Sequence, residues 1–287
     1  MMDRPQFRSV LASALARAGG LELATPRMTA GIDGRRTGRR SGNALEFSEY
    51  REYQAGDDLR QLDWGVFARS EQLMVKLYSE EVDPRCDIVL DDSASMATEE
   101  AKAAAALGLA GLLAQAAANA GFSLAVWHAR ETLEKEPFPY RPLEWSCGAF
   151  DGGASPGEAF GRFAGGFQSR GIRIVVTDLL WPEEPGRFLR RLADGAMRAV
   201  VIQLLTRDEL DPAVSGTVSL TDAETGEERE LAADDALLAR YRQRLARHQE
   251  LWSRAAGEYG VRLIRLTVEE FYPGWDLQQL FRCGVLK

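Results

Sequence analysis

Short runs of apolar, mostly β-branched residues alternate along the chain with longer segments whose apolar residues recur at helical spacing. A short apolar run bounded by turn residues is typical of a strand buried on both faces, and alternation of such strands with helices is typical of a parallel sheet. The pattern therefore predicts an α/β protein. The five expected strands of the sheet are Ile88–Leu90, Phe122–Trp127, Ile172–Asp178, Ala199–Leu205 and Val261–Leu266.

Helical periodicity is clearest in three segments. Residues 6–18 place their apolar side chains on one face and stop at Gly19-Gly20, residues 101–120 are rich in alanine, and residues 234–259 are charged with one apolar side. Residues 217–231 are typical of a hairpin that turns at Glu224–Gly226. We also expect a strand over 73–78 and helices near 156–167, 189–192 and 276–282.

Composition narrows the class of protein. The 287 residues are 45% apolar and carry 35 Lys and Arg against 43 Asp and Glu, so the net charge of −8 does not indicate a surface for nucleic acid or an anionic membrane. No run reaches the roughly 18 apolar residues of a transmembrane helix, and residues 1–20 lack the apolar centre of a signal peptide. Cys86, Cys147 and Cys283 fit neither a disulfide framework nor a zinc site. We expect a cytoplasmic protein with no transmembrane segment and no nucleic-acid partner.

Candidate chemistry follows two of the expected strands. Asp91, Ser93 and Ser95 form a DxSxS pattern where the strand Ile88–Leu90 ends, and Asp178 ends the strand that begins at Ile172. Ligands of open α/β sheets bind at the carboxyl ends of strands, so these oxygens could converge on a hard cation. Mg²⁺ suits them best, with Mn²⁺ or Ca²⁺ as alternatives, and Ser155 in a glycine-rich loop offers a further hydroxyl.

A purely structural interpretation of the same residues remains open at this point. In it, Ser93, Ser95 and Thr98 cap the helix that follows, and Asp91 is an acid in the turn.

The segment from Leu45 to Arg69 is dense with charges and aromatic rings and has a turn at Gly56-Asp57-Asp58. It can fold only if its acids meet its arginines. One interpretation is an ion-pair latch against the main domain, and the other is a docking face for a partner. The candidate docking residues are Arg51, Asp57, Asp58, Arg60, Asp63, Trp64 and Arg69.

These motifs resemble known families. The stretch Ile88–Met96 resembles the first metal-binding segment of von Willebrand factor type A domains, and Val175–Asp178 is similar to their later aspartate segment. Upstream, the motifs between Glu46 and Arg69 resemble the bacterial family called domain of unknown function 58. The resemblance implies a Rossmann-like von Willebrand A core at 83–287 and an N-terminal extension at 1–82. It also implies an adhesion-type metal site at Asp91, Ser93, Ser95 and Asp178, and a MoxR-type AAA+ ATPase as partner.

The favoured function is a non-catalytic interaction module, in which an acidic side chain of a protein partner completes the coordination of the metal. The first alternative is a magnesium-dependent phosphohydrolase with Asp91 as nucleophile, which would need a second acid at position 93, where this chain has serine. The second is a scaffold with a non-functional metal site.

Overall fold

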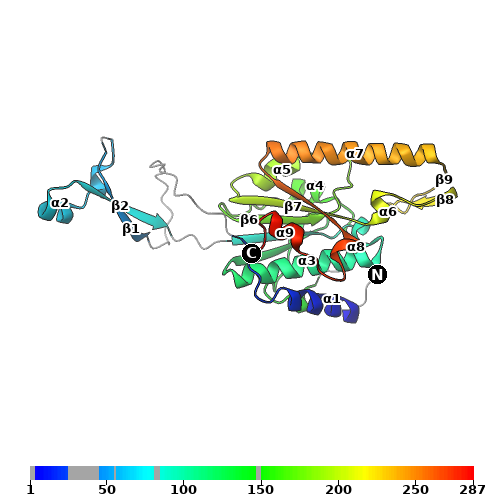
Figure 1. Cartoon of the computed structure of the whole chain (residues 1–287), viewed down its shortest axis with the longest axis horizontal. Coiled ribbons are helices and arrows are strands. Elements are labelled where there is room, and N and C mark those ends of the chain that lie inside the picture. The colour runs from blue at the N-terminus through cyan, green and yellow to red at the C-terminus, as the bar shows by residue number, and fades with distance from the viewer. Residues whose placement is uncertain (1–3, 25–44, 55, 81–84, 147–149) are drawn as a thin grey trace. The chain divides into compact units, whose positions relative to one another are not determined.

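The computed structural model describes residues 4–24, 45–54, 56–80, 85–146 and 150–287 (Figure 1). The chain forms two compact units, the larger comprising Met1–Pro26 and Pro84–Lys287 and the smaller Arg27–Asp83. This division differs from the expected boundary after residue 82, because helix α1 (Arg4–Arg17) belongs to the larger unit. Its apolar face explains this, since Leu11 and Ala14 are fully buried in the main core.

A six-stranded sheet with the order β10-β7-β6-β3-β4-β5 organises the larger unit. All neighbouring strands run parallel except β5, which pairs antiparallel with β4. The strands are β3 (Arg85–Asp91), β4 (Ser123–Ala129), β5 (Leu133–Lys135), β6 (Ile172–Thr177), β7 (Arg198–Leu205) and β10 (Arg262–Thr267). The predicted mixed α/β class with a mostly parallel sheet is confirmed. Because β3 and β6 are neighbours, their carboxyl ends lie side by side.

Helices cover both faces of this sheet (Figure 1). One core contains α1, α3 (Glu100–Asn119), α8 (Val268–Phe271) and α9 (Gln278–Arg282), whereas the other contains α4 (Pro156–Arg162), α5 (Pro185–Ala193) and α7 (Asp235–Glu258). Strand β3 contributes side chains to both cores, Ile88 and Leu90 to the first and Val89 to the second. Successive side chains of a strand point to opposite faces, which is why an unbroken apolar run suits this central position.

Helix α3 is packed closely on almost every side. A Cβ atom added at Gly108 would overlap the indole ring of Trp275, and one at Gly111 would lie 2.6 Å from Leu11 Cδ2. Contrary to the sequence-based expectation, α3 is long and apolar enough to cross a membrane, and among the described residues it alone meets that test. In the protein, 83% of its apolar window is buried, as in a core helix.

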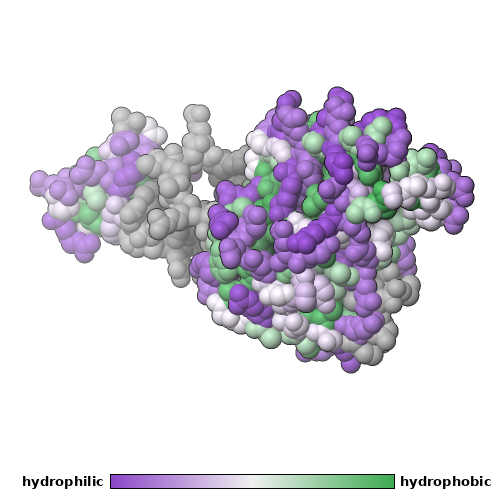
Figure 2. Space-filling view, turned by 45° about the vertical axis from the view of Figure 1, so that its right-hand side comes forward, coloured by the Kyte–Doolittle hydropathy of each residue, from purple (hydrophilic) through white to green (hydrophobic). Residues whose placement is uncertain are grey.

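A hairpin of β8 (Gly216–Thr221) and β9 (Glu228–Ala233) follows the short helix α6 (Arg207–Leu210) and leads into α7. The hairpin predicted over 217–231 is therefore confirmed. It lies at the carboxyl edge of the sheet, at the right-hand side of Figure 1, and Figure 2 shows that hydrophilic residues cover much of the visible surface of the protein. A 3-10 turn, η3 (Pro142–Glu144), lies in the connection after β5.

The smaller unit contains an antiparallel pair, β1 (Leu45–Glu52) with β2 (Met74–Glu80). The connection carries the turn η1 (Leu59–Gln61) and helix α2 (Trp64–Ser70). The strand predicted over 73–78 corresponds to β2, whereas β1 was not predicted. Its charged residues hid the strand pattern.

Candidate metal centre

Asp91 is the last residue of β3 and is completely buried. Its Oδ1 accepts hydrogen bonds from Ser93 N at 3.1 Å and from Ser93 Oγ at 2.5 Å. Its Oδ2 accepts one from Thr177 Oγ1, at the end of β6, at 2.7 Å. A hydrogen bond to the Asp91 carboxylate thus connects the ends of the neighbouring strands β3 and β6, at the edge where ligands bind in open α/β sheets.

The two serines of the DxSxS pattern lie together. Ser93 Oγ and Ser95 Oγ are 3.1 Å apart, and Ser95 belongs to the 3-10 turn η2 (Ala94–Ala97). Helix α3 begins after Glu99, and neither Ser93 nor Glu99 makes a side-chain cap hydrogen bond. The interpretation of these serines as helix caps is therefore wrong, because their hydroxyls bond to Asp91 and to each other.

A lysine ammonium lies beside the second aspartate. Lys102 Nζ, on α3, donates to Asp178 Oδ2 at 3.0 Å, to Glu209 Oε1 at 2.5 Å and to the carbonyl O of Ser95 at 3.0 Å. The Lys102 side chain is 0% exposed. Burial alone would lower the pKa of Lys102, but the charges of Asp178 and Glu209 outweigh it and raise the pKa, so the group stays cationic.

The electrostatics around Asp91 are those of a site short of positive charge. Burial, and after it the negative charge of Asp178, raise the pKa of Asp91 to about 7, although the hydrogen bonds from Ser93 and Thr177 act in the opposite direction. Lys102 pairs with Glu209 as well as with Asp178, so one cation faces two carboxylates here. A cation between the hydroxyls and Asp91 would relieve the remaining repulsion.

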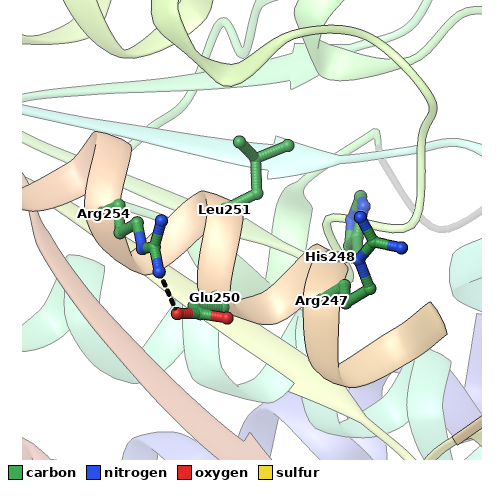
Figure 3. A pocket seen from close by; sticks show the side chains of 5 residues that line it. All are labelled: Arg247, His248, Glu250, Leu251 and Arg254. Atoms are coloured by element: carbon green, nitrogen blue, oxygen red, sulfur yellow. Dashed lines mark hydrogen bonds and ion pairs between the residues drawn. The ribbon is translucent and has the colours of Figure 1, made fainter. Parts of the chain in front are cut away.

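Side chains from α7 and β7 contact the backbone carbonyls of Asp178 and Leu179. Leu179 has φ +57°, a left-handed conformation that residues other than glycine rarely adopt. His248 Nε2 lies 2.6 Å from the carbonyl O of Leu179, and Gln203 Nε2 donates to the carbonyl O of Asp178 at 2.8 Å. His248 also lines a surface pocket of about 430 Å³ together with Arg247, Glu250, Leu251 and Arg254, whose side chains are drawn in Figure 3. The Asp178 carboxylate itself accepts from Lys102 Nζ through Oδ2 and from Leu180 N through Oδ1, at 2.9 Å.

Ser155, the further hydroxyl considered from the sequence, has a different local role. Its Oγ accepts from Glu158 N at 3.2 Å, which caps α4, and donates to Glu183 Oε1 at 2.7 Å. The structure places Thr177, and not Ser155, in contact with Asp91.

A second carboxylate approaches the serine loop from outside. Glu224, at the tip of the β8–β9 hairpin, accepts from Ser95 N at 2.9 Å and from Ala94 N at 3.4 Å. It brings a further negative charge to the loop.

The carboxylate and hydroxyl oxygens of this site suit a hard cation as ligands. Within the described part of the chain, no group of three or more His, Cys, Asp or Glu side chains could hold a metal, so a cation here would rely on serine hydroxyls as well as carboxylates. Asp91, Ser93 and Ser95 supply such oxygens within hydrogen-bond distance of one another, and oxygen ligands are those that Mg²⁺, Mn²⁺ and Ca²⁺ take. Asp178, which is paired with Lys102, adds charge nearby.

In the smaller unit, several candidate docking residues have structural contacts. Arg51 pairs with Asp57 at 2.8 Å, as expected for acids that meet arginines. Asp58 accepts from Arg60 N at the start of η1. Asp63 caps α2 by accepting from Gly65 N at 2.8 Å. Exposed positions remain at Arg60, Trp64 and Arg69, and 61% of the Trp64 surface is accessible.

Four residues of the site were not predicted: Lys102, Thr177, Glu209 and Glu224. Lys102 carried a signal, because it is the one basic residue in a mostly apolar helix, and a buried charge needs a partner. Thr177 adjoins Asp178 on a predicted strand. For Glu209 and Glu224, we find no sequence pattern that would have placed them here.

Together these features define an α/β protein with a mostly parallel sheet and an oxygen-rich site at the carboxyl edge. The chain belongs to the family described as protein of unknown function DUF58, whose profile matches residues 49–142 and 157–251. The family predicted from the sequence motifs is confirmed.

The chain is also similar to three mycobacterial proteins and to two solved structures. The uncharacterized proteins Mb1516 of Mycobacterium bovis and MT1527 and Rv1480 of Mycobacterium tuberculosis are 28% identical over 271 residues, which cover 87% of this chain and 83% of theirs. BatB from Bacteroides thetaiotaomicron is 14% identical, with a TM-score of 0.35 over 64% of this chain and 90% of its own. An aerotolerance-related membrane protein from Bacteroides fragilis is also 14% identical, with a TM-score of 0.39 over 69% and 99%.

Proposed function

We propose that the protein is a non-catalytic interaction module with a von Willebrand A-type core. In this proposal Mg²⁺ is held by Asp91, Ser93 and Ser95 and binds an acidic side chain of a protein partner. The resemblance of the motifs makes a MoxR-type AAA+ ATPase the expected partner.

The observation that carries the proposal is the convergence of Asp91, Ser93 and Ser95 with Asp178 at neighbouring strand ends. Asp91 and the serines form a continuous set of oxygens, linked at 2.5 and 3.1 Å. Asp178 adds its charge close enough to raise the pKa of Asp91. When bound, the cation would supply positive charge and an open coordination position for a carboxylate.

The residues around the site orient these oxygens. Thr177 donates to Asp91 Oδ2, which restricts the orientation of that carboxylate, and Lys102 donates to Asp178 Oδ2. Asp92 fixes the start of the serine loop, because its carboxylate accepts from Arg130 Nε at 2.6 Å and from Phe150 N at 3.0 Å. Ser93, two positions after Asp91, donates to Asp91 and does not provide the acid that a phosphohydrolase would need, which favours binding over catalysis.

Calorimetric titration of the full chain with Mg²⁺ tests the metal site. We expect saturable binding that Asp91→Asn, and separately the double change Ser93→Ala with Ser95→Ala, weaken at least about tenfold because oxygen ligands are lost. The exposed carboxylate of Asp211 pairs with Arg242, so Asp211→Asn is a matched control that should bind normally. Unchanged binding in the Asp91 and serine variants would refute the metal site.

Capture of a purified MoxR-type ATPase in Mg²⁺ and in EDTA tests the interaction. Binding that requires Mg²⁺ and Asp91 supports the proposal, whereas equal capture in EDTA would favour the scaffold alternative. Mg²⁺-dependent release of phosphate from p-nitrophenyl phosphate that Asp91→Asn abolishes would contradict a non-catalytic role.

A further inference from the structure

The tip of the β8–β9 hairpin places a carboxylate on the loop that carries both site serines. Ser95 N donates to Glu224 Oε1 at 2.9 Å, and Ala94 N is 3.4 Å from Glu224 Oε2. Both oxygens of one side chain therefore face two successive backbone N–H groups. Glu224 is 129 residues from Ser95 in sequence, so this contact depends on the folded position of the hairpin.

The turn presents Glu224 in a fixed geometry. Asp222 Oδ1 accepts from Glu224 N at 2.9 Å and from Thr225 N at 2.8 Å, and Gly226 N donates to the carbonyl O of Asp222 at 2.8 Å. Gly226 has φ +71°, which glycine adopts without strain. A turn closed in this way loses little further entropy when its side chain is bound.

The arms of the hairpin, in contrast, are only weakly anchored. Every residue of β8 and β9 is exposed except Val218, which is half-buried, and Ala233 at the base, which is buried. Elements with little buried surface open at low free-energy cost. The hairpin tip can therefore leave the serine loop without disrupting the core.

We infer that Glu224 competes with the carboxylate of the partner for the loop of Ser93 and Ser95. The hairpin tip caps this loop, and an acidic side chain of the partner must displace Glu224 from it. This inference rests on the proposed function, because it concerns the same loop and the same ligand chemistry. The partner that fits presents an Asp or Glu on an exposed turn. Competition of this kind weakens the apparent affinity by the fraction of molecules whose loop is uncapped.

Hydrogen exchange in EDTA tests the cap without any metal. We expect Glu224→Ala to accelerate exchange of the Ser95 amide about tenfold, the effect of losing one hydrogen bond to a charged group. Glu227, on the same hairpin, pairs with Arg229 in solvent, so Glu227→Ala is the matched control and should leave Ser95 unchanged. Equal Ser95 exchange in wild type and both variants would overturn the inference.

Binding of an acidic probe in Mg²⁺ tests the competition. The probe is a synthetic peptide of residues 219–230, and a second peptide carries Gln in place of Glu224. The first peptide should bind the Glu224→Ala protein about tenfold more tightly than wild type, and the second should bind neither. Equal affinity of the first peptide for both proteins would also overturn the inference. If Glu224→Ala accelerates Ser95 exchange but the protein binds no Mg²⁺, the cap is retained and the proposed metal site is refuted. If the protein binds Mg²⁺ but Ser95 exchanges equally fast in wild type and Glu224→Ala, the metal site is retained and the cap is refuted.

Discussion

Replacing Lys102 with Met should lower the free energy of unfolding by about 3–5 kcal/mol, because it leaves two carboxylates near the site without their cation. The Lys102 side chain is 0% exposed and Asp178 only 2%, and their charged atoms are 3.0 Å apart. Glu209, at 2.5 Å, is 20% exposed. Methionine matches the length of the lysine stem, so the loss reflects the missing charge more than a cavity.

A surface pair of similar geometry provides the control. Lys287 Nζ and Glu22 Oε2 are 2.8 Å apart, but their side chains are 57% and 43% exposed. Lys287→Met should therefore cost less than about 1 kcal/mol, since water screens the pair. Urea unfolding, followed by tryptophan fluorescence and circular dichroism, measures both variants.

A second variant separates charge from packing. Adding Glu209→Gln to Lys102→Met removes one of the unpaired charges and should recover part of the lost stability. If Lys102→Met costs no more than Lys287→Met, or if the double variant is less stable than the single one, the argument from buried charge is refuted.

Two further predictions concern packing and pH. Gly108→Ala should lower the free energy of unfolding by about 1–3 kcal/mol because its Cβ would overlap Trp275. Gly257→Ala, with open space around it on α7, should raise it by about 0.5–1 kcal/mol. Urea midpoints of the two variants that move in the same direction would contradict this prediction. Burial lowers the pKa of His128 from 6.5, against the charges of Asp92 and Glu136, so the unfolded chain binds more protons and stability falls as pH drops through 6.5. His128→Gln should reduce this loss of stability, measured as the drop in the urea midpoint between pH 7.5 and 5.5. The same drop in wild type and in the variant would contradict the assignment to His128.

Much of the larger unit could be predicted because its signals are local. The runs Ile88–Leu90 and Ala199–Leu205 are strands because β-branched residues occur in short apolar blocks, and DxSxS sits where the first of them ends. Placing Asp178 beside Asp91 needed only the assumption that parallel neighbours share an edge, which the β3–β6 pairing confirms.

The remaining features depend on long-range contacts. Lys102 meets Asp178 and Glu209 across 76 and 107 residues of sequence. Such contacts leave no periodicity in a single sequence. The affiliation of α1 with the larger unit was missed for the same reason, since an amphipathic helix does not reveal which surface it covers.

The glycines of α3 tie the volumes of distant positions to one another. The space that a side chain would need at Gly108 is filled by the ring of Trp275, and Leu11 fills the space beside Gly111. Glycine has no side-chain rotamers to restrict, so at these two positions the helix loses no side-chain entropy, and Trp275 and Leu11 supply the volume. Substitutions at these positions must therefore be paired: a larger residue at Gly108 or Gly111 fits only when Trp275 or Leu11, respectively, is replaced by a smaller one.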